Sequence, residues 1–343
     1  ASLYSGFVPS GLSGSPQENT ILGIDAGSSL TTGTSHTLIG NRAGENLTVE
    51  FGTTAVGFKA GINQNAESFN TYIGYQSGRD NTGAQSVFVS GNSRVFNSGQ
   101  TSNGVTAVGY SAHDTNAGNF STAIGYTAGK SATGDSGTYI GRGAGTNNTA
   151  ASHVSIGHDA GYSNTSGANN INIGYQAGYD NTTNGSRTII GYEAGEHNTG
   201  ANNTFLGYHA GTGVAGSSTA DRTTVIGSEA GEALTTGLVS TFIGYQAGKA
   251  MTVGTGNVAI GSEALKTEDS RSFSTACGSS ALQDQNAAAN AYNAAFGYQA
   301  GATITTGIKN TIVGGIAAND NSLLTGSNNI VIGYDSAPSA DNV

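Results

Sequence analysis

The stretch HVSIGHD gathers residues that are able to bind a metal ion. His153 and His158 lie five positions apart, and Asp159 follows directly. Imidazole nitrogens and carboxylate oxygens are ligands of Zn²⁺, and a three-fold axis would multiply such a set. A solvated corner with polar side chains accounts for the same residues without a metal. We therefore expect no metal ion and no cofactor in this chain.

Carboxylates recur two positions after a repeated glycine. Two carboxylates facing a groove are the machinery of glycoside hydrolysis. Charged side chains at an exposed corner also keep a long surface soluble, and that explanation needs no cleft. We predict no catalytic residue among them. The carboxylates are Asp25, Asp159, Glu193, Glu229, Glu263 and Asp335.

Two glycine-rich stretches match nucleotide-binding loops only in part. GYTAGKS, residues 125–131, has three residues between its glycines, whereas a phosphate-binding loop needs four and a following helix. GTGVAG, residues 211–216, fits G-x-G-x-x-G, but such a match arises by chance in a chain with 55 glycines among 343 residues. Cys277 falls at a repeated apolar position, where we interpret it as a small hydrophobe rather than a nucleophile. The sequence predicts that the protein is not an enzyme.

Tyrosine follows the repeated glycine in nine places, and this column is the candidate ligand-facing surface. An aromatic face stacks on a sugar ring, and the phenol adds a hydrogen bond. The alternative is that these rings pack between chains or cover a corner of the fold. The candidate residues are Tyr75, Tyr126, Tyr175, Tyr192, Tyr208 and Tyr245.

One short repeat must position all of these residues. The glycine of an apolar–Gly pair, which we call the anchor glycine, recurs nineteen times from Gly23 to Gly333, mostly at intervals of 16 or 17 residues. A short fixed period is the signature of a solenoid. Each unit holds a β-branched or aromatic run, the anchor, small residues and a turn rich in Asn, Thr and Gly. The sequence therefore predicts an all-β parallel solenoid of about nineteen coils.

The residue before the anchor glycine is apolar in eighteen of the nineteen units, with Ser90 as the exception. Such uniformity predicts an inward ladder of stacked core residues. Alternation along a strand places the threonine three before the anchor on the same face. Asparagines seven after the anchor in the middle coils predict an amide ladder. The predicted core ladder is Ile39, Ile73, Ile124, Ile140, Ile173, Ile190, Ile243 and Ile260.

The residue two before the anchor should then face outward, yet it is often large and apolar. A strand that is apolar on both faces is buried on both faces. A narrow single chain cannot cover its own outer face, so the pattern predicts a trimer interface. The candidate interface residues are Tyr72, Tyr139, Phe205, Phe242 and Ile312.

Composition and charge exclude several classes of protein. The chain has only 3 prolines and no G-X-Y period, which excludes collagen. Its 12 Lys and Arg residues form no basic stripe and its net charge is −10, so nucleic acid and anionic membranes are excluded as partners. No run of 18 apolar residues exists, so we expect no membrane insertion. A single cysteine excludes an intrachain disulfide.

The repeat divides the chain into three parts. Residues 1–18 are expected to be a lead-in or linker, residues 19–337 a continuous array, and residues 338–343 a tail that continues into a longer protein. The period breaks near residues 84–104, 212–224 and 283–295. Loops on a rigid scaffold commonly carry specificity, so receptor contacts are expected there.

The stretches NVAIGSEAL, residues 257–265, and STAIGYTAG, residues 121–129, carry a family resemblance. They resemble the S/T-V-A-I-G repeats in the head domains of trimeric autotransporter adhesins, and similar repeats occur in phage and other viral tail fibres. The resemblance covers residues 19–337 and implies a left-handed parallel β-roll of three chains side by side. The longer period, the tyrosine after the anchor and the lack of a coiled-coil stalk or membrane anchor favour a viral fibre.

We therefore expect an extracellular homotrimeric fibre, the shaft or head of a phage tail fibre, that attaches the virion to a host receptor or glycan. The alternative is a bacterial cell-surface adhesin of the autotransporter type. An ice-binding solenoid needs a flat exposed array of paired threonines, whereas this chain has one threonine per coil, expected inward. A glycan-cleaving spike needs a carboxylate pair in a cleft.

Overall fold

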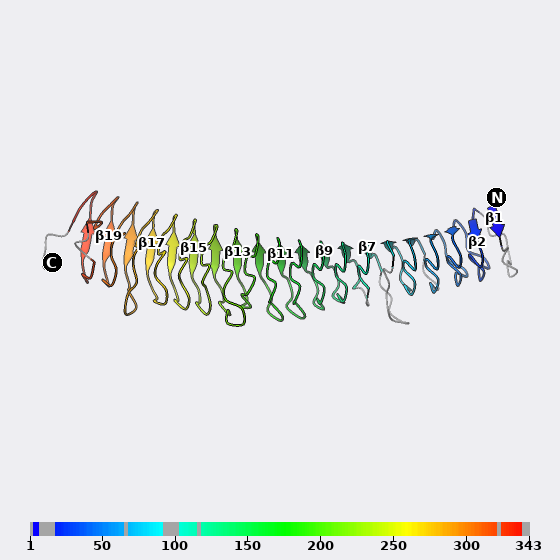
Figure 1. Ribbon diagram of the computed structural model, residues 1–343, viewed down its shortest axis with the longest axis horizontal. Helices are drawn as coiled ribbons and strands as arrows, with labels where there is room; N and C mark the ends of the chain where they lie inside the picture. The colour runs from blue at the N-terminus through cyan, green and yellow to red at the C-terminus, as the bar shows by residue number, and fades with distance from the viewer. Residues whose placement is uncertain are drawn as a thin grey trace. The chain divides into compact units, whose positions relative to one another are not determined.

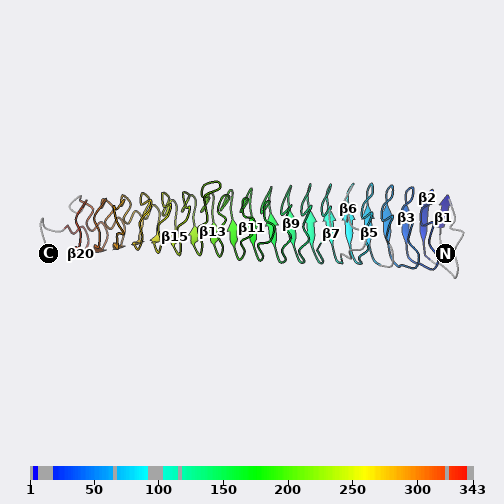
Figure 2. The same ribbon diagram turned by 90° about the horizontal axis from the view of Figure 1, so that it is seen from below.

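The computed structural model describes residues 3–6, 18–64, 68–91, 103–114, 118–320 and 324–337. These residues form an all-β parallel solenoid with one short strand per coil and a period near 17 residues, which confirms the predicted parallel solenoid (Figures 1 and 2). The coils fall into two units, residues 1–169 and residues 170–343. The described segments contain no helix long and apolar enough to cross a bilayer.

Unit 1 contains the first ten strands, and each pairs in parallel with the next along the chain. Equivalent residues of successive coils lie side by side, so Thr20 pairs with Thr37 and Thr37 with Thr54. The strands are β1 (Leu3–Gly6), β2 (Thr20–Gly23), β3 (Thr37–Ile39), β4 (Thr54–Val56), β5 (Thr71–Ile73), β6 (Val87–Val89), β7 (Thr106–Val108), β8 (Thr122–Ile124), β9 (Thr138–Ile140) and β10 (Val154–Ile156).

Unit 2 repeats this arrangement with ten more strands in the same parallel order. Thr188 pairs with Thr204, and Thr204 with Thr224. The strands are β11 (Ile171–Ile173), β12 (Thr188–Ile190), β13 (Thr204–Leu206), β14 (Thr224–Ile226), β15 (Thr241–Ile243), β16 (Val258–Ile260), β17 (Thr275–Cys277), β18 (Ala294–Phe296), β19 (Thr311–Val313) and β20 (Ile330–Ile332).

A glycine follows nearly every strand at the anchor position, because a side chain there would press on the backbone of the next coil. Gly125 has a φ of +137°, and a Cβ at this position would lie 2.5 Å from the carbonyl oxygen of Gly141 in the next coil. Coil 87–91 differs from the prediction. Ile73 pairs with Val89, so Ser90, with a φ of 147°, occupies the anchor position in place of Gly91. Val89 therefore replaces Ser90 in the apolar column, and the predicted exception disappears.

The two faces of the strands are opposite to the prediction. The residue two before the anchor, which we call the inner column, points into the coil, so the predicted interface residues are core residues. Tyr72, Tyr139, Phe205, Phe242 and Ile312 are all fully buried within a single chain. The prediction of a trimer interface at these residues was therefore wrong.

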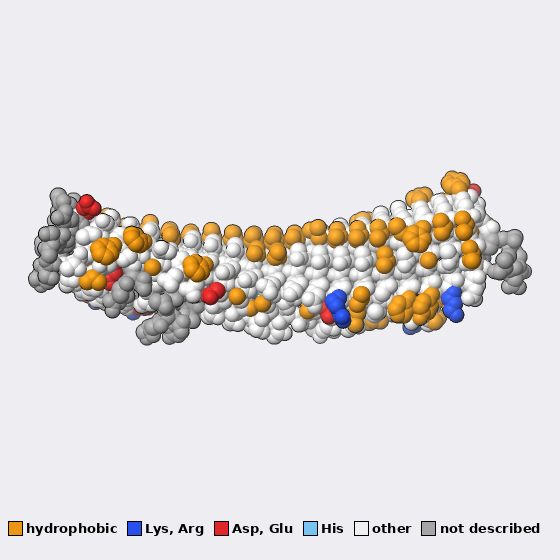
Figure 3. Space-filling view, turned by 180° about the vertical axis from the view of Figure 1, so that it is seen from behind, with side chains coloured by type: hydrophobic (Ala, Val, Ile, Leu, Met, Phe, Trp, Pro, Cys, Tyr) orange, Lys and Arg blue, Asp and Glu red, His pale blue; other side chains and the backbone are white. Residues whose placement is uncertain are grey.

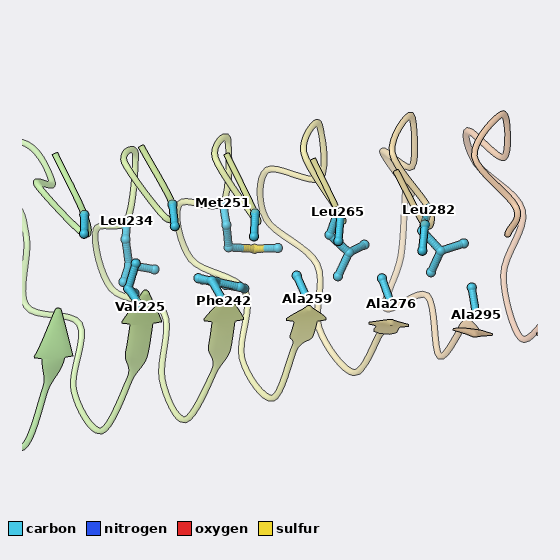
Figure 4. Packing of buried hydrophobic residues seen from close by; sticks show 14 of the residues in the cluster. Val225, Leu234, Phe242, Met251, Ala259, Leu265, Ala276, Leu282 and Ala295 are labelled. Carbon is cyan, nitrogen blue, oxygen red and sulfur yellow. The ribbon is translucent and has the colours of Figure 1, made fainter. Parts of the chain in front are cut away.

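The inner column is large because the opposite wall of the coil is small. The Ala three after the anchor and the Gly four after it form that wall, as Ala60 and Gly61 do. A Cβ on Gly61 would lie 2.7 Å from the ring of Tyr72, so the ring fills the space that the glycine leaves. Figure 4 shows the core of unit 2, where the side chains of Val225 and Phe242 point from their strands into the coil, toward Leu234 and Met251.

The residue before the anchor, which we call the aliphatic column, lies on the outer face. Ile73, Ile124 and Ile260 are 41%, 39% and 38% exposed. The other members of the predicted core ladder, Ile39, Ile140, Ile173, Ile190 and Ile243, are half-buried. The prediction that this column forms the core was wrong, because alternation along a strand relates neighbouring residues but does not say which of two apolar columns points inward. Cys277 belongs to this outer column and is half-buried.

The asparagines seven after the anchor lie inside the coils, but they form only part of the predicted ladder. The amide of Asn164 donates a 2.7 Å hydrogen bond to Asn148 of the preceding coil. Asn181 instead donates to the carbonyl of Asn184 in its own coil. Asn148 also donates a 2.7 Å bond to the Tyr139 hydroxyl, so the column satisfies the buried polar groups of the core.

The structure describes the irregular coil at residues 212–224 completely and the one at residues 84–104 only in part. In the insertion at residues 212–224, Ser218 pairs with Asn198 and Asp221 with Leu238, so the longer loop returns to the ladder. Residues 92–102 of the irregular segment 84–104 lie outside the described residues, as does the tail 338–343. Within the expected lead-in, Leu3–Gly6 forms β1 and pairs with β2.

Candidate functional site

The outer face of the strands carries one aliphatic side chain per coil. Successive strands lie about 4.8 Å apart, so these side chains form continuous apolar rows in each unit. Figure 3 shows hydrophobic side chains in rows that run from coil to coil. The column consists of Leu22, Ile39, Val56, Ile73, Val89, Val108, Ile124, Ile140 and Ile156 in unit 1, and of Ile173, Ile190, Leu206, Ile226, Ile243, Ile260, Cys277, Phe296, Val313 and Ile332 in unit 2.

A second outward column, which we call the threonine column, lies beside the aliphatic column. Its residues stand two positions earlier in each strand, and Thr37, Thr54 and Thr188 are half-buried. Thr204 and Thr311 are exposed. The prediction that these threonines point inward was therefore wrong. Each coil that has a threonine at this position presents a hydroxyl and an apolar side chain on the same face, in register with its neighbours.

The predicted ligand-facing tyrosines do lie on the surface. Tyr75, Tyr126, Tyr175, Tyr192, Tyr208 and Tyr245 are all exposed. Three of them stack on one another: the ring centroids of Tyr175 and Tyr192 lie 5.0 Å apart, and those of Tyr192 and Tyr208 lie 5.5 Å apart. Tyr75 and Tyr126 stack on Phe58 and Tyr110. The faces of these rings are therefore occupied by neighbouring rings, and their edges and hydroxyls face the solvent.

Tyr245 differs from the stacked tyrosines. Its neighbours in the column are Ser228 and Ser262, which are too short to cover a ring. No described aromatic ring stacks on Tyr245, and the side chain is 49% exposed. No described aromatic side chain covers this ring, and an uncovered aromatic face is what stacking on a sugar requires.

Glu229 and Glu263, two of the carboxylates that stand two positions after the anchor, are paired with lysines. Lys249 lies 2.5 Å from Glu229, and Lys266 lies 2.7 Å from Glu263. Hydrogen bonds from Lys249 and Gln246 lower the pKa of Glu229, so this carboxylate is ionised at neutral pH. A general acid for glycoside hydrolysis needs a raised pKa and a partner carboxylate across a cleft. Glu229 instead stabilises the surface.

The structure does not bring the candidate metal ligands together. His153 is buried, and its Nε2 hydrogen-bonds with the carbonyl of Gly167. His158 is at the surface, where its Nδ1 lies 3.2 Å from Asp159. Within the described ranges no cluster of three or more His, Cys, Asp or Glu side chains has metal-binding geometry.

A groove of about 560 Å³ lies beside the insertion at residues 212–224. Two lysines and one carboxylate line it among small residues, so a ligand in this groove would lie beside both positively and negatively charged side chains. The lining residues are Gly213, Glu232, Ala233, Lys249, Ala250, Lys266 and Thr267. The sequence pointed to the insertion, but the lysines come from later coils and only their stacking brings them to it.

The comparisons with known proteins assign no family. The sequence matches no protein-family model and no curated protein.

Sequence reasoning missed several buried ionisable residues, among them His113 and Arg187. His113 takes the place of the glycine four after the anchor, and Arg187 lies four before an anchor. Both side chains are fully buried. Their signal in the sequence was a titratable or charged residue in a column that mostly holds small or short polar residues, and only the inward direction of these columns gives that signal meaning.

Proposed function

We propose that this chain is the rigid shaft or head of a homotrimeric extracellular fibre, a phage tail fibre that attaches the virion to its host. The observation that supports the proposal is the aliphatic column. A solenoid that acts alone needs polar residues at the outward positions of its strands. This chain completes its core inside each coil and still places an aliphatic residue outward on every strand.

Contact with a partner chain explains the exposed aliphatic column better than the folding of a single chain does. Soluble monomers rarely expose contiguous apolar patches larger than a few hundred Å². Leu22, Ile73 and Leu206 are 49%, 41% and 43% exposed, and none of them is required by the core. Two further copies of the same chain would bury these rows against one another, as the resemblance to trimeric fibre repeats implies.

The repeated ladder suits a fibre that acts at a distance. Backbone hydrogen bonds join each coil to the next at several positions around its circumference, for example from Gly27 to Ala43 and from Thr31 to Thr48. A trimer presents every surface site three times, which strengthens weak contacts with a receptor. The exposed Tyr245 ring and the groove beside residues 212–224 are the proposed receptor contacts, with a glycan as the ligand class.

The native mass tests the proposal. Light scattering and an unheated denaturing gel should give about three times the 34.1 kDa mass of one chain. A monomer at the same concentrations would contradict it. A trimer leaves the bacterial adhesin as the alternative, and a gene that continues into a membrane barrel would favour that alternative.

A second candidate function rests on the threonine column. Outward threonines in register beside aliphatic residues form a flat array of hydroxyl and methyl groups, which is the kind of surface that orders water into ice. Thermal hysteresis of a purified solution tests this function. Its absence would dismiss ice binding, and hysteresis from a monomer would favour it over the fibre.

A further inference from the structure

Arg187 is a fully buried cation in the core of unit 2. It precedes β12 and lies four positions before Gly191, in a column that holds mostly short polar side chains such as Asn170, Asn203 and Thr223. Among the described residues it has the largest fully buried side chain. Burying an unpaired charge costs several kcal/mol, so this position needs a physical explanation.

The protein satisfies only part of the guanidinium group. Nη2 donates a 2.6 Å hydrogen bond to the carbonyl of Asn198. Within the described part of the chain, Nε and Nη1 have no hydrogen-bond acceptor. Burial lowers the pKa of Arg187 to about 10, and no carboxylate offsets this effect. The side chain therefore remains charged at neutral pH without a counter-ion from the protein.

Two neighbouring asparagine amides also contain a buried polar atom that has no hydrogen-bond partner among the described residues. The Nδ2 group of Asn198 is a buried donor that bonds to no described residue. Asn172 occupies the inner column, where the next two coils bury Ile189 and Phe205, and its Oδ1 is also without a partner in the described structure. An asparagine amide rotated by 180° presents Nδ2 at the same place, so it offers a donor as readily as an acceptor.

The fold brings these groups to the same corner of consecutive coils. The Asn172 amide lies against Gly178, and Nη2 of Arg187 lies within 3.4 Å of a Cβ built on Gly195. Gly178 and Gly195 are equivalent positions, four after their anchors, so the two polar groups lie at the same corner of adjacent coils. Asn172 is also shorter than the aromatic residues of this column.

We propose that a small monovalent anion, chloride in its natural setting, binds inside unit 2 between Arg187, Asn198 and Asn172. The unpartnered donors point to a ligand that accepts hydrogen bonds from one edge of the guanidinium group, through Nε or Nη1, and from Nδ2 of Asn198, and the charge of Arg187 selects a negative one. A water molecule would satisfy the donors but would leave the charge uncompensated. The site is closed to solvent, so it accepts a single ion rather than a carboxylate or phosphate on a larger ligand. The ion stabilises the coil stack whether or not the chain trimerises.

The dependence of stability on chloride tests the proposal. Thermal unfolding of the full chain is followed in sodium chloride and in sodium gluconate at equal ionic strength. We expect the midpoint to rise with chloride concentration and to stay constant when gluconate replaces it, because a ligand that binds only the folded state stabilises it by mass action. The variant Arg187→Met should lose this dependence, whereas Arg222→Met, which removes an exposed arginine, should keep it.

Equal midpoints in the two salts would overturn the proposal, as would a chloride dependence that persists in Arg187→Met. Should that variant fail to fold, crystals of the unaltered protein grown in sodium bromide give the same answer. An anomalous bromide peak beside Arg187 supports the site. An ordered water molecule at that place, with no anomalous signal, refutes it.

Discussion

Asn81 donates a hydrogen bond of 2.8 Å to the hydroxyl of Tyr72, and both side chains are fully buried in one coil of unit 1. Asn148 and Tyr139 repeat the relationship at 2.7 Å. Burial raises the pKa of Tyr72 well above its ordinary value and that of Tyr139 to about 12, so both phenols stay neutral. The asparagine column thus allows a tyrosine to fill the core without an unsatisfied hydroxyl.

Tyr72→Phe should lower the free energy of unfolding by about 1 kcal/mol, because it removes one buried hydrogen bond. Asn81 keeps a second acceptor in the carbonyl of Gly83, so the loss stays small. Tyr126→Phe, which alters an exposed ring, is the matched control and should leave stability unchanged. Urea unfolding measures both, and equal effects would show that the buried bond contributes nothing.

Gly125→Ala should destabilise unit 1 by more than the cost of its backbone conformation alone. The sparsely populated conformation at a φ of +137° costs an alanine about 1 to 3 kcal/mol, and its Cβ would also press on the carbonyl of Gly141. Gly216→Ala separates the two effects, because Gly216 has a φ of +70° but open space around its Cα. Denaturant unfolding of both variants should rank Gly125→Ala as the costlier. The reverse order would contradict the close approach of successive coils.

Acid should destabilise unit 1 between pH 6.5 and pH 4. Burial lowers the pKa of His113 to about 4 and also lowers the pKa values of His36 and His153. Below pH 6.5 these histidines bind protons in the unfolded chain but stay neutral in the folded chain. The free energy of unfolding therefore falls as the pH falls, and it is constant above pH 6.5. His113 alone accounts for a loss of about 3 kcal/mol across the range.

Urea unfolding at several pH values checks this expectation, with His113→Asn as the comparison. Asparagine accepts the positive φ of this position, 46°, and does not titrate. The variant should lose less stability on acidification than the unaltered chain. Equal losses would show that His113 is not the group responsible.

Ile124→Glu should reduce the trimer to a monomer if the aliphatic column is the interface. A glutamate in a buried contact between copies would lose its hydration without a partner. Phe120→Glu changes a more exposed residue, 68% accessible, that stands before the strand and outside the column. Light scattering should give a monomer for the first variant and a trimer for the second. A trimer in both cases would place the interface elsewhere.

Tyr245→Ala should weaken binding to host polysaccharide more than Tyr192→Ala does. No described aromatic side chain covers the ring of Tyr245, whereas the ring of Tyr192 lies between Tyr175 and Tyr208. Binding of the purified protein to an array of immobilised bacterial polysaccharides provides the measurement. Unchanged binding in Tyr245→Ala would remove this tyrosine from the proposed receptor contacts and leave the groove beside residues 212–224.

Much of this architecture was determined by the sequence alone. The spacing of the anchor glycines requires stacked coils of about 17 residues, because a glycine that recurs at one interval marks one corner of a repeating unit. The same spacing predicted the exposed tyrosines, since residues at a corner beside a glycine seldom reach the core. Local chemistry was sufficient for both conclusions.

Tertiary structure alone decided which face of the strands is the core. Phe242 and Ile243 are both apolar, and alternation separates them without orienting either. The orientation follows from volume, because the alanine and glycine wall across the coil leaves room for a large ring only on the inner side. Stacking likewise decided that Ser90 is an anchor and that Arg187 is buried beside two asparagines, since both depend on residues about 11 to 17 positions away in the chain.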